Sequence, residues 1–306
     1  FLQSAAILEG ALKKFVAANN LIDSELIIYS NWADWRALAA TQVSKNVIAV
    51  SRAHNADVYF ERHPKSYLPF RKLLLENLDA VFFISENGKA YTVSKMLGGL
   101  KKDLLVARLG TPFKGRNPDA DEKVLTVVSC SRMDRVKRID LIGDILCKSN
   151  LPIRWIHFGD GNSRNELEVL RKEWMKKLPS LTIEFMGNVS NEQVMQFYLS
   201  HHVDLFINTS EYEGIPVAMM EAMSTGIPVM ATNAGGVNEL VNDENGKLIQ
   251  QPVNIEEAAK WLHKFYSLSS EEKKLKREKA FEMWNKNFNA AINSLVFAKE
   301  LLELKK

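Results

Sequence analysis

Short apolar runs alternate along this chain with longer segments whose apolar residues recur at helical spacing. Such runs favour strands, and because most of them lack a polar residue at every second position, they are typical of parallel strands covered on both faces. The expected strands lie at residues 25–29, 46–51, 80–84, 104–107, 123–130, 153–158, 181–185, 203–207, 227–231 and 247–249. The pattern therefore predicts two α/β halves, each with a parallel sheet, and a cleft between them.

Helices are expected between the strands and at both ends of the chain. Residues 1–20 carry apolar side chains on one helical face, and the pattern from Pro69 to Leu78 is also helical. The tail from Phe288 to Leu302 is predicted to be an amphipathic helix that needs a partner surface. Capping boxes predict further helix starts at Ser163 with Glu166, Ser190 with Gln193, and Asn254 with Glu257.

Residues 110–121 concentrate glycine, proline, asparagine and aspartate, as loops between structured segments do. At 306 residues the chain is long enough for two domains of ordinary size. We expect a first domain over 1–112, a linker over 113–121 and a second domain over 122–286. A final helix over 287–306 is expected to pack back towards the first domain.

Residues 203–249 hold two successive strand–turn–helix units. In the first unit, the strand over 203–207 is followed by a polar turn that carries Glu213 and Gly214. The strand of the second unit, over 227–231, also ends before a glycine pair and a helix. Phosphorylated ligands bind at the C-terminal ends of strands in open parallel sheets, so we expect a ligand site here.

Pro216 is predicted to be the first residue of the helix, because its missing N–H is not needed there. The N–H groups of Val217 and Ala218 then lack intrahelical acceptors and, with the helix dipole, suit a diphosphate. Glu221 lies about 7.5 Å further along the axis, at about 1.5 Å per residue, where it can accept hydrogen bonds from a ribose diol. Glu213, before the helix, would face a transferred sugar. The alternative is that both glutamates are solvated surface residues.

Two cations follow the strand at 123–130. Arg132 and Lys137 can neutralise a diphosphate leaving group, the guanidinium as a fork and the ammonium as a point charge, unless they form a solvated basic loop. Gly159 begins a Gly-x-Gly turn after the next strand, but Arg164 stands where a dinucleotide fingerprint has its third glycine. Nicotinamide binding is therefore not indicated, and a tight turn before a helix is the alternative.

Histidines and aspartates give weaker signals. His54 ends a strand of the first half and is a candidate for binding sugar hydroxyls, with a structural histidine as the alternative. His201 and His202 are expected to be C-terminal capping or surface residues. Asp119 and Asp121 resemble a metal motif but precede a strand, so we interpret them as a solvated turn.

Composition excludes several classes of protein. The net charge is +3, from 40 basic and 37 acidic residues, which is too balanced to indicate nucleic-acid binding. The two cysteines, Cys130 and Cys147, are too few for a disulfide framework or a metal cluster, and we expect free core thiols of a reducing compartment. Apolar runs stay below the roughly 18 residues needed to span a bilayer, and a signal-peptide pattern is absent from the sequence.

As a set, these motifs resemble the retaining glycosyltransferases of family 4, the group 1 glycosyl transferases, which have the GT-B fold. Glu213 and Glu221, with seven residues between them, match the family's Glu-x7-Glu signature. The resemblance is strong over residues 124–250 and weaker over 46–112. The other segments that carry it are GTPFKG before the linker, Arg132 with Lys137, FGDG, FMGNVS, and SEYEGIPVAMMEAMSTGIPVMATNAGGVNEL.

The resemblance implies that a nucleoside-diphosphate sugar is held mainly by the second domain. Arg132 and Lys137 would bind the diphosphate, and Glu221 would bind the ribose. Glu213 and His54 would face the donor sugar and are the catalytic candidates. The remaining donor-binding residues that it implies belong to the helix-opening turn and the base pocket: Gly214, Ile215, Pro216, Val217, Ala218, Gly159 and Val189.

The activity that the resemblance implies is a retaining, metal-independent hexosyl transfer without a cofactor. The donor would be a UDP-sugar, with GDP and ADP as alternatives. The acceptor would be a saccharide or a lipid-linked saccharide of bacterial cell-surface polysaccharide or glycolipid synthesis. We expect a cytoplasmic protein, with peripheral association at the inner face of the cytoplasmic membrane. Three alternatives stay open: a GT-B sugar-nucleotide epimerase, a glycogen-synthase-like enzyme and a non-catalytic nucleotide-sugar-binding module.

The chain departs from the family pattern in two places. Ser131 and Arg138 stand where the family has glycines beside its arginine and lysine. Only four expected strands precede the linker, whereas the family has more and opens with a glycine-rich strand and loop on the acceptor side. The chain also begins at Phe1 rather than at a methionine. We therefore interpret the first domain as incomplete at its N-terminus and expect much of the acceptor site to be missing.

Overall fold

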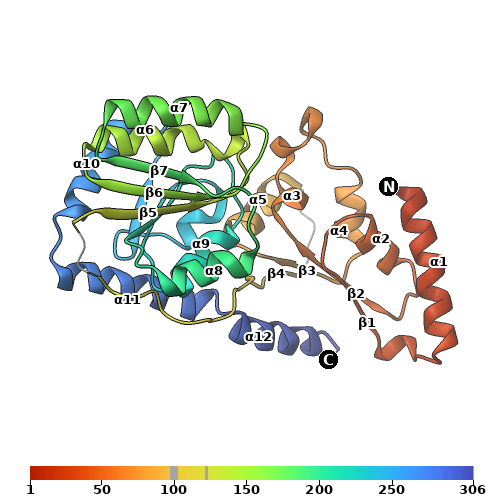
Figure 1. The fold of residues 1–306 in the computed structure, drawn as a ribbon. Coiled ribbons are helices and arrows are strands. Elements are labelled where there is room, and N and C mark those ends of the chain that lie inside the picture. The colour runs from red at the N-terminus through yellow and green to blue at the C-terminus, as the bar shows by residue number, and fades with distance from the viewer. Residues whose placement is uncertain (97–102, 121–122, 306) are drawn as a thin grey trace. The chain divides into compact units, whose positions relative to one another are not determined.

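The computed structural model describes residues 1–96, 103–120 and 123–305. The chain divides into two compact units, of which the first comprises Phe1–Leu109 with Ala291–Lys306 and the second comprises Gly110–Ala290. Each unit has a parallel sheet with helices packed on it (Figure 1). The predicted class, two α/β units with parallel sheets, is therefore confirmed.

Among the described residues, the first unit has a four-stranded sheet in the order β1-β2-β3-β4. Its strands are β1 (Ile27–Ser30), β2 (Ile48–Ala53), β3 (Ala80–Phe83) and β4 (Asp103–Val106). Its helices are α1 (Leu2–Ala18), α2 (Trp35–Thr41), α3 (Asn55–Val58), α4 (Arg71–Asn77), α5 (Glu86–Met96) and α12 (Ala290–Glu303).

The predicted amphipathic tail forms α12, and the sheet of the first unit supplies the partner surface that it requires. Phe297 of this helix packs edge-on against Phe82 of β3, with 4.9 Å between ring centroids. The guanidinium of Arg52, on β2, lies 4.0 Å from the centroid of the same Phe297 ring. The opposite face of the sheet is covered by small and branched side chains of α2 and α4, among them Ala37 and Leu74. Helices thus cover both faces of the first sheet, which explains why its strands are mostly apolar.

The second unit has a six-stranded parallel sheet in the order β10-β9-β8-β5-β6-β7, counted over the described residues. Its strands are β5 (Leu125–Cys130), β6 (Ile153–Phe158), β7 (Leu181–Phe185), β8 (Leu205–Asn208), β9 (Val229–Thr232) and β10 (Gly246–Ile249). Its helices are α6 (Ile139–Ser149), α7 (Arg164–Lys177), α8 (Asn191–Ser200), α9 (Val217–Ser224), α10 (Ile255–Tyr266) and α11 (Ser270–Asn287).

Helices cover both faces of this sheet (Figure 1), with α6, α7 and α10 on one face and α8, α9 and α11 on the other. Trp155 of β6 and Trp174 of α7 are fully buried in the first of these layers. Phe206 of β8 and Trp284 of α11 are fully buried in the second. Burying one such side chain contributes about 1.5–3 kcal/mol, so these two layers fix the strand ends on which the site is built.

The segment predicted as a linker is anchored to the second unit over its described residues. Asn117 is 5% exposed, and its side-chain amide donates to the carbonyl oxygen of His201 at 2.8 Å. The Arg277 guanidinium donates to the Asn117 carbonyl oxygen at 2.8 Å. Asp121, the last residue of the predicted linker, lies outside the described residues.

Several local predictions need correction. Ser163 precedes α7 but forms no capping hydrogen bond with its side chain in the described structure, because its backbone is not in the extended conformation. The box at Ser190 and Gln193 is present. A box that we did not predict caps α11 through Ser269 and Glu272. No helix among the described residues is long and apolar enough to cross a membrane.

Candidate functional site

The centre of the second sheet is a topological switch point. Strand β5 pairs with β6 on one side and with β8 on the other, so the chain leaves the two central strands in opposite directions. The helices that follow β5 and β8, α6 and α9, lie on opposite faces of the sheet, and ligands of open α/β sheets bind at the C-terminal strand ends of such a point. Lys137 lies in the first loop and Glu213 in the second.

Lys137 and Glu213 form an ion pair in this structure. The Lys137 ammonium donates to Glu213 Oε1 at 2.6 Å, although 76 residues separate the two in sequence. Asn208, the last residue of β8, points its amide nitrogen at the same oxygen from 3.5 Å. Glu213 is 9% exposed, so it is a buried carboxylate and not the solvated residue of the alternative interpretation.

Backbone contacts fasten the Glu213 turn to its neighbours. The Glu211 N–H donates to the Val136 carbonyl oxygen at 2.9 Å, which ties the loop after β8 to the loop after β5. The Gly236 N–H donates to the Gly214 carbonyl oxygen at 3.0 Å. At Gly235, where φ is +57°, an added Cβ would lie 1.9 Å from the Glu213 carbonyl oxygen. The glycine pair after β9 is therefore required for the close approach of two backbones.

The start of α9 differs from the prediction by one residue. Pro216 is the N-cap, with extended backbone angles, and Val217 is the first helical residue. The shift by one residue does not change the prediction that the first amides of the helix are free, because the first intrahelical hydrogen bonds run from the Met219 and Met220 N–H groups to the Pro216 carbonyl oxygen. The amides of Val217 and Ala218 have no hydrogen-bond acceptor among the described residues. Two N–H groups are thus free at the positive end of this helix.

Two residues of this turn serve partly as structure. Gly214 is buried, and its carbonyl oxygen is engaged by the second glycine of the pair after β9. Ile215 is 8% exposed and packs in the core layer formed by α8, α9 and α11. Gly214 has no side chain and that of Ile215 is buried, so both residues offer a ligand only backbone groups.

Glu221 lies on α9 and is half-buried. Its Oε1 accepts a hydrogen bond of 2.6 Å from the side-chain amide of Asn191, the first residue of α8. Burial raises the pKa of Glu221, against the opposing effects of the Asn191 hydrogen bond and of Lys114. The described residues provide no hydrogen-bond donor to its second oxygen, which leaves that oxygen free to accept from a ligand.

Arg132 does not join the Lys137–Glu213 pair. Its side chain is 73% exposed, and its Nε lies 3.0 Å from Asp134 Oδ2. The guanidinium is therefore held loosely at the surface by a pair that solvent screens strongly. A role for Arg132 in binding a diphosphate stays a prediction.

Gly159 follows β6 with φ at +134°, and an added Cβ would lie 1.9 Å from the Ser131 carbonyl oxygen. Its N–H donates to the Gly187 carbonyl oxygen at 2.9 Å, which joins the turns after β6 and β7. Val189 follows in the second of these turns and is partly buried against the core. The structure thus brings Gly159 and Val189 to adjacent turns at the C-terminal edge of the sheet.

His54 belongs to the first unit and precedes α3 at the end of β2. Its ring packs against Trp32, with 4.5 Å between centroids. The backbone N–H of His54 donates to Asp57 Oδ2 at 3.1 Å, and the same oxygen accepts from the backbone N–H of Ala33 at 3.2 Å. The buried Nε2 atom has no hydrogen-bond partner among the described residues, and burial lowers the pKa of His54. His54 is therefore a neutral imidazole near pH 7, with an unused nitrogen.

Two asparagines that hold the glutamates, Asn208 and Asn191, were not predicted from the sequence. Asn208 Oδ1 accepts the Ser210 N–H at 2.9 Å, which leaves only its amide hydrogens to face Glu213. Asn191, in the first turn of α8, donates its side-chain amide N–H to Glu221. The position of Asn208 at the C-terminal end of a buried strand was the available signal.

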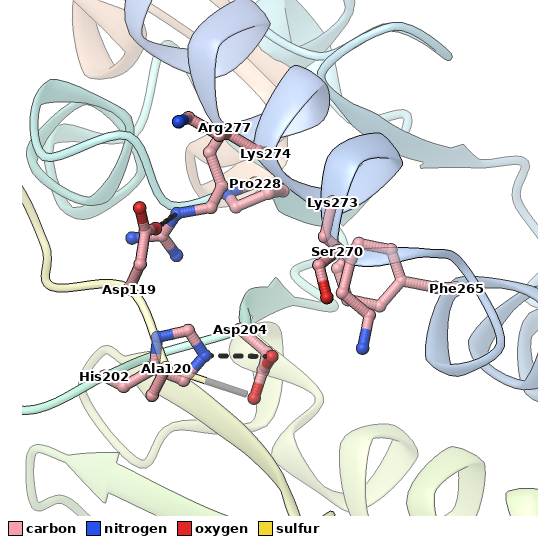
Figure 2. Close-up of a pocket in the computed structure, with 10 residues that line it drawn as sticks. All are labelled: Asp119, Ala120, His202, Asp204, Pro228, Phe265, Ser270, Lys273, Lys274 and Arg277. Atoms are coloured by element: carbon pink, nitrogen blue, oxygen red, sulfur yellow. Dashed lines mark hydrogen bonds and ion pairs between the residues drawn. The ribbon is translucent and has the colours of Figure 1, made fainter. Parts of the chain in front are cut away.

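A hollow of about 320 Å³ lies at the N-terminal ends of β8 and β9, away from the candidate site (Figure 2). His202 is not the surface residue that we predicted, because its side chain is 8% exposed and bonds Asp204 at 3.1 Å and the Pro118 carbonyl oxygen at 2.8 Å. Arg277 pairs with Asp119 at 3.0 Å across the same hollow. These contacts fasten the 117–120 segment to the sheet, and we interpret the hollow as structural.

The two cysteines are half-buried rather than fully buried. Burial, with a smaller contribution from Glu221, raises the pKa of Cys130 to about 12, so its thiol is protonated and unreactive. Neither cysteine takes part in the site.

Comparison with known proteins decides the family. Residues 112–281 match the model of the glycosyl transferases group 1, which is more than half of the chain. The chain belongs to this family. The matched range contains the switch point, both glutamates and every predicted donor-binding residue of the second unit.

Several relatives of this chain are named as glycosyltransferases. The chain is 28% identical over 243 residues to the O-antigen biosynthesis glycosyltransferase WbnH of Escherichia coli, covering 78% of this chain and 66% of the relative. It is 26% identical over 175 residues to the phosphatidylinositol N-acetylglucosaminyltransferase gpi3 subunit of Schizosaccharomyces pombe, covering 56% of this chain and 37% of the relative. The chain thus spans less than two thirds of the length of these relatives.

Solved structures establish the fold. Sucrose-phosphate synthase from Thermosynechococcus elongatus superposes with a TM-score of 0.79 at 19% identity, over 99% of this chain and 78% of that chain. Anabaena Alr3699/HepE in complex with UDP superposes with a TM-score of 0.77 at 18% identity, over 97% and 82% of the two chains. The predicted GT-B class is therefore confirmed.

Proposed function

We propose that this chain transfers a sugar from a nucleoside-diphosphate sugar to a saccharide or lipid-linked acceptor. Family membership supports the reaction class. The functions for which the two relatives are named, O-antigen biosynthesis and transfer of N-acetylglucosamine to phosphatidylinositol, support the two kinds of acceptor. The complex of the HepE structure with UDP supports a uridine nucleotide as the first donor to test, with GDP and ADP as alternatives.

The observation that carries the proposal is the juxtaposition at the switch point. Lys137 and the free amides of Val217 and Ala218 give positive potential to one sheet edge, where a diphosphate binds. Such a site neutralises a diphosphate without a divalent cation, so we propose that transfer is independent of metal. Glu213, beside Lys137, accepts a hydrogen bond from a hydroxyl of the donor sugar.

The remaining roles follow from position along the same edge. Glu221 accepts a hydrogen bond from a ribose hydroxyl through its free oxygen. It lies further along the helix axis than the phosphate position, at a rise of about 1.5 Å per residue. Gly159 and Val189 border the base, and Arg132 adds a second contact to the phosphates. The resemblance assigns His54 to the transferred sugar. The cytoplasmic location and the peripheral membrane association also stay predictions of the resemblance.

The experiment is a panel of sugar nucleotides with saccharide and lipid-linked acceptors, followed by NMR of the product. The proposal predicts release of a nucleoside diphosphate together with an acceptor-linked sugar whose anomeric configuration is that of the donor. An anomeric coupling that shows inversion contradicts the retaining mechanism. Release of nucleotide without any acceptor-linked sugar, in the presence of the full acceptor panel, supports the epimerase alternative and contradicts transfer.

A further inference from the structure

We propose that Glu213 restrains Lys137 and thereby lowers the affinity of the site for the nucleoside diphosphate itself. The inference rests on the proposed function, since it concerns the same diphosphate position. It assigns to Glu213 a second effect besides contact with the sugar, namely weakening the hold on the nucleotide product.

The contact between the two charges is short and shielded. Lys137 Nζ lies 2.6 Å from Glu213 Oε1, with the two side chains 25% and 10% exposed. Charge-assisted hydrogen bonds of this length are about twice as strong as neutral ones, and solvent screens them less when they are partly buried. The carboxylate therefore cancels much of the positive potential that the ammonium offers to a phosphate.

The carboxylate cannot easily turn away from the lysine. Asn208 Oδ1 accepts the Ser210 N–H, so the amide nitrogen of Asn208 is fixed on the Glu213 side. The Thr209 hydroxyl donates to the Arg138 carbonyl oxygen at 2.7 Å, which joins the two loops next to the ion pair. Glu213 is therefore held beside Lys137 before any ligand arrives.

A diphosphate must then share one ammonium with a fixed carboxylate. The ammonium has three N–H donors, of which Glu213 uses one, so binding remains feasible. Because Glu213 already engages the ammonium, a phosphate gains less from Lys137 than it would from an unpaired lysine, and nucleotide binding is weaker. The donor sugar offsets the cost by donating a hydroxyl to Glu213, whereas the nucleoside diphosphate released after transfer has no such hydroxyl at that position. Glu213 thus favours the sugar-bearing donor over the nucleotide product.

The experiment compares nucleotide affinity in the wild-type chain and in Glu213→Gln, which removes the charge and keeps the shape. Calorimetric titrations with UDP, GDP and ADP are run in EDTA. For the nucleotide that the wild type binds, we expect Glu213→Gln to bind about threefold or more tightly, with the gain shrinking at high salt. Glu211→Gln is the matched control, because it removes an exposed carboxylate two residues before Glu213. The affinity of this variant for the nucleotide should equal that of the wild type.

A Lys137→Met background separates restraint of the lysine from simple repulsion. If Glu213 acts through Lys137, the gain from Glu213→Gln becomes smaller in that background. An equal or larger gain there contradicts the restraint, since direct repulsion does not need the lysine. If Glu213→Gln fails to fold, as judged by its melting curve, Glu213→Met replaces it as a neutral variant of similar length.

The outcomes separate this inference from the proposed function. A wild-type chain that binds none of the three nucleotides contradicts the proposed function, and the inference falls with it. A wild-type chain that binds one of them, with Glu213→Gln binding equally or more weakly, overturns the inference and leaves the proposed function in place.

Discussion

Replacement of Glu221 by glutamine tests the assignment of the ribose position. Asn191 donates a hydrogen bond of 2.6 Å to Glu221 Oε1, and this donor persists in the variant. The glutamine carbonyl oxygen must therefore face Asn191, which turns the amide NH2 group towards the ligand. The change converts an anionic acceptor into a neutral donor, at the place where a ribose hydroxyl needs an acceptor.

The expected cost follows from that lost contact. A hydrogen bond to a charged group contributes about 1.5–3 kcal/mol. At about 1.4 kcal/mol for each factor of ten, the affinity for the nucleoside diphosphate should fall by about 10- to 150-fold. The half-buried position of Glu221 favours the upper part of this range, because solvent replaces the lost contact less readily there.

The assay is calorimetric titration with the nucleoside diphosphate and with its dideoxy analogue, which lacks the ribose diol. The wild type should prefer the ribonucleotide strongly, and Glu221→Gln should lose most of this preference by weakening only the ribonucleotide. Glu192→Gln, an exposed neighbour of Asn191, is the control and should behave as the wild type. Equal weakening of both nucleotides in Glu221→Gln would refute the ribose assignment.

Two further predictions concern stability. Burial lowers the pKa of His202, but its hydrogen bonds to two acceptor oxygens prevail and raise the pKa above the ordinary value. The stabilisation from His202 is therefore complete below about pH 6.5 and disappears as pH rises through the raised pKa. The loss of melting temperature in His202→Asn should be larger at about pH 6 than at about pH 9, and a pH-independent loss would contradict this prediction. Gly235→Ala places a Cβ 1.9 Å from the Glu213 carbonyl oxygen at a positive φ, and it should lower the free energy of unfolding in urea by about 1–3 kcal/mol and also weaken nucleotide binding. Gly10→Ala, whose added Cβ has no atom within 4 Å, should be neutral or stabilising. Equal stabilities of the two variants would contradict the close approach at Gly235.

The sequence predicts the strands of this chain well because parallel strands covered on both faces are unbroken apolar runs. All ten strands of the described residues begin within two residues of the expected position; β2, for example, begins at Ile48 where residue 46 was expected. Boundaries that depend on backbone angles were less accessible. Pro216 has a φ compatible with a helix, yet its ψ of 124° makes it the N-cap, and the sequence does not determine that angle.

The sequence supplies candidate residues for the site but not the contacts between them. The turn chemistry before α9 predicts a phosphate position, and the spacing of Glu213 and Glu221 predicts separate places for sugar and ribose; both stay predictions. The ion pair of Glu213 with Lys137 spans 76 residues and depends on which strands are neighbours in the sheet. Strand order is a tertiary property, so one sequence without relatives does not contain it in readable form.

The most direct test of the account is calorimetric titration of the wild-type chain and of Lys137→Met with UDP, GDP and ADP in EDTA. The account predicts that one of these nucleotides binds the wild type without metal, and that Lys137→Met binds it at least about tenfold more weakly, as the loss of a charge-assisted contact to phosphate requires. Binding that appears only after Mg²⁺ or Mn²⁺ is added, or that is unchanged in Lys137→Met, would contradict a metal-independent diphosphate site at this sheet edge.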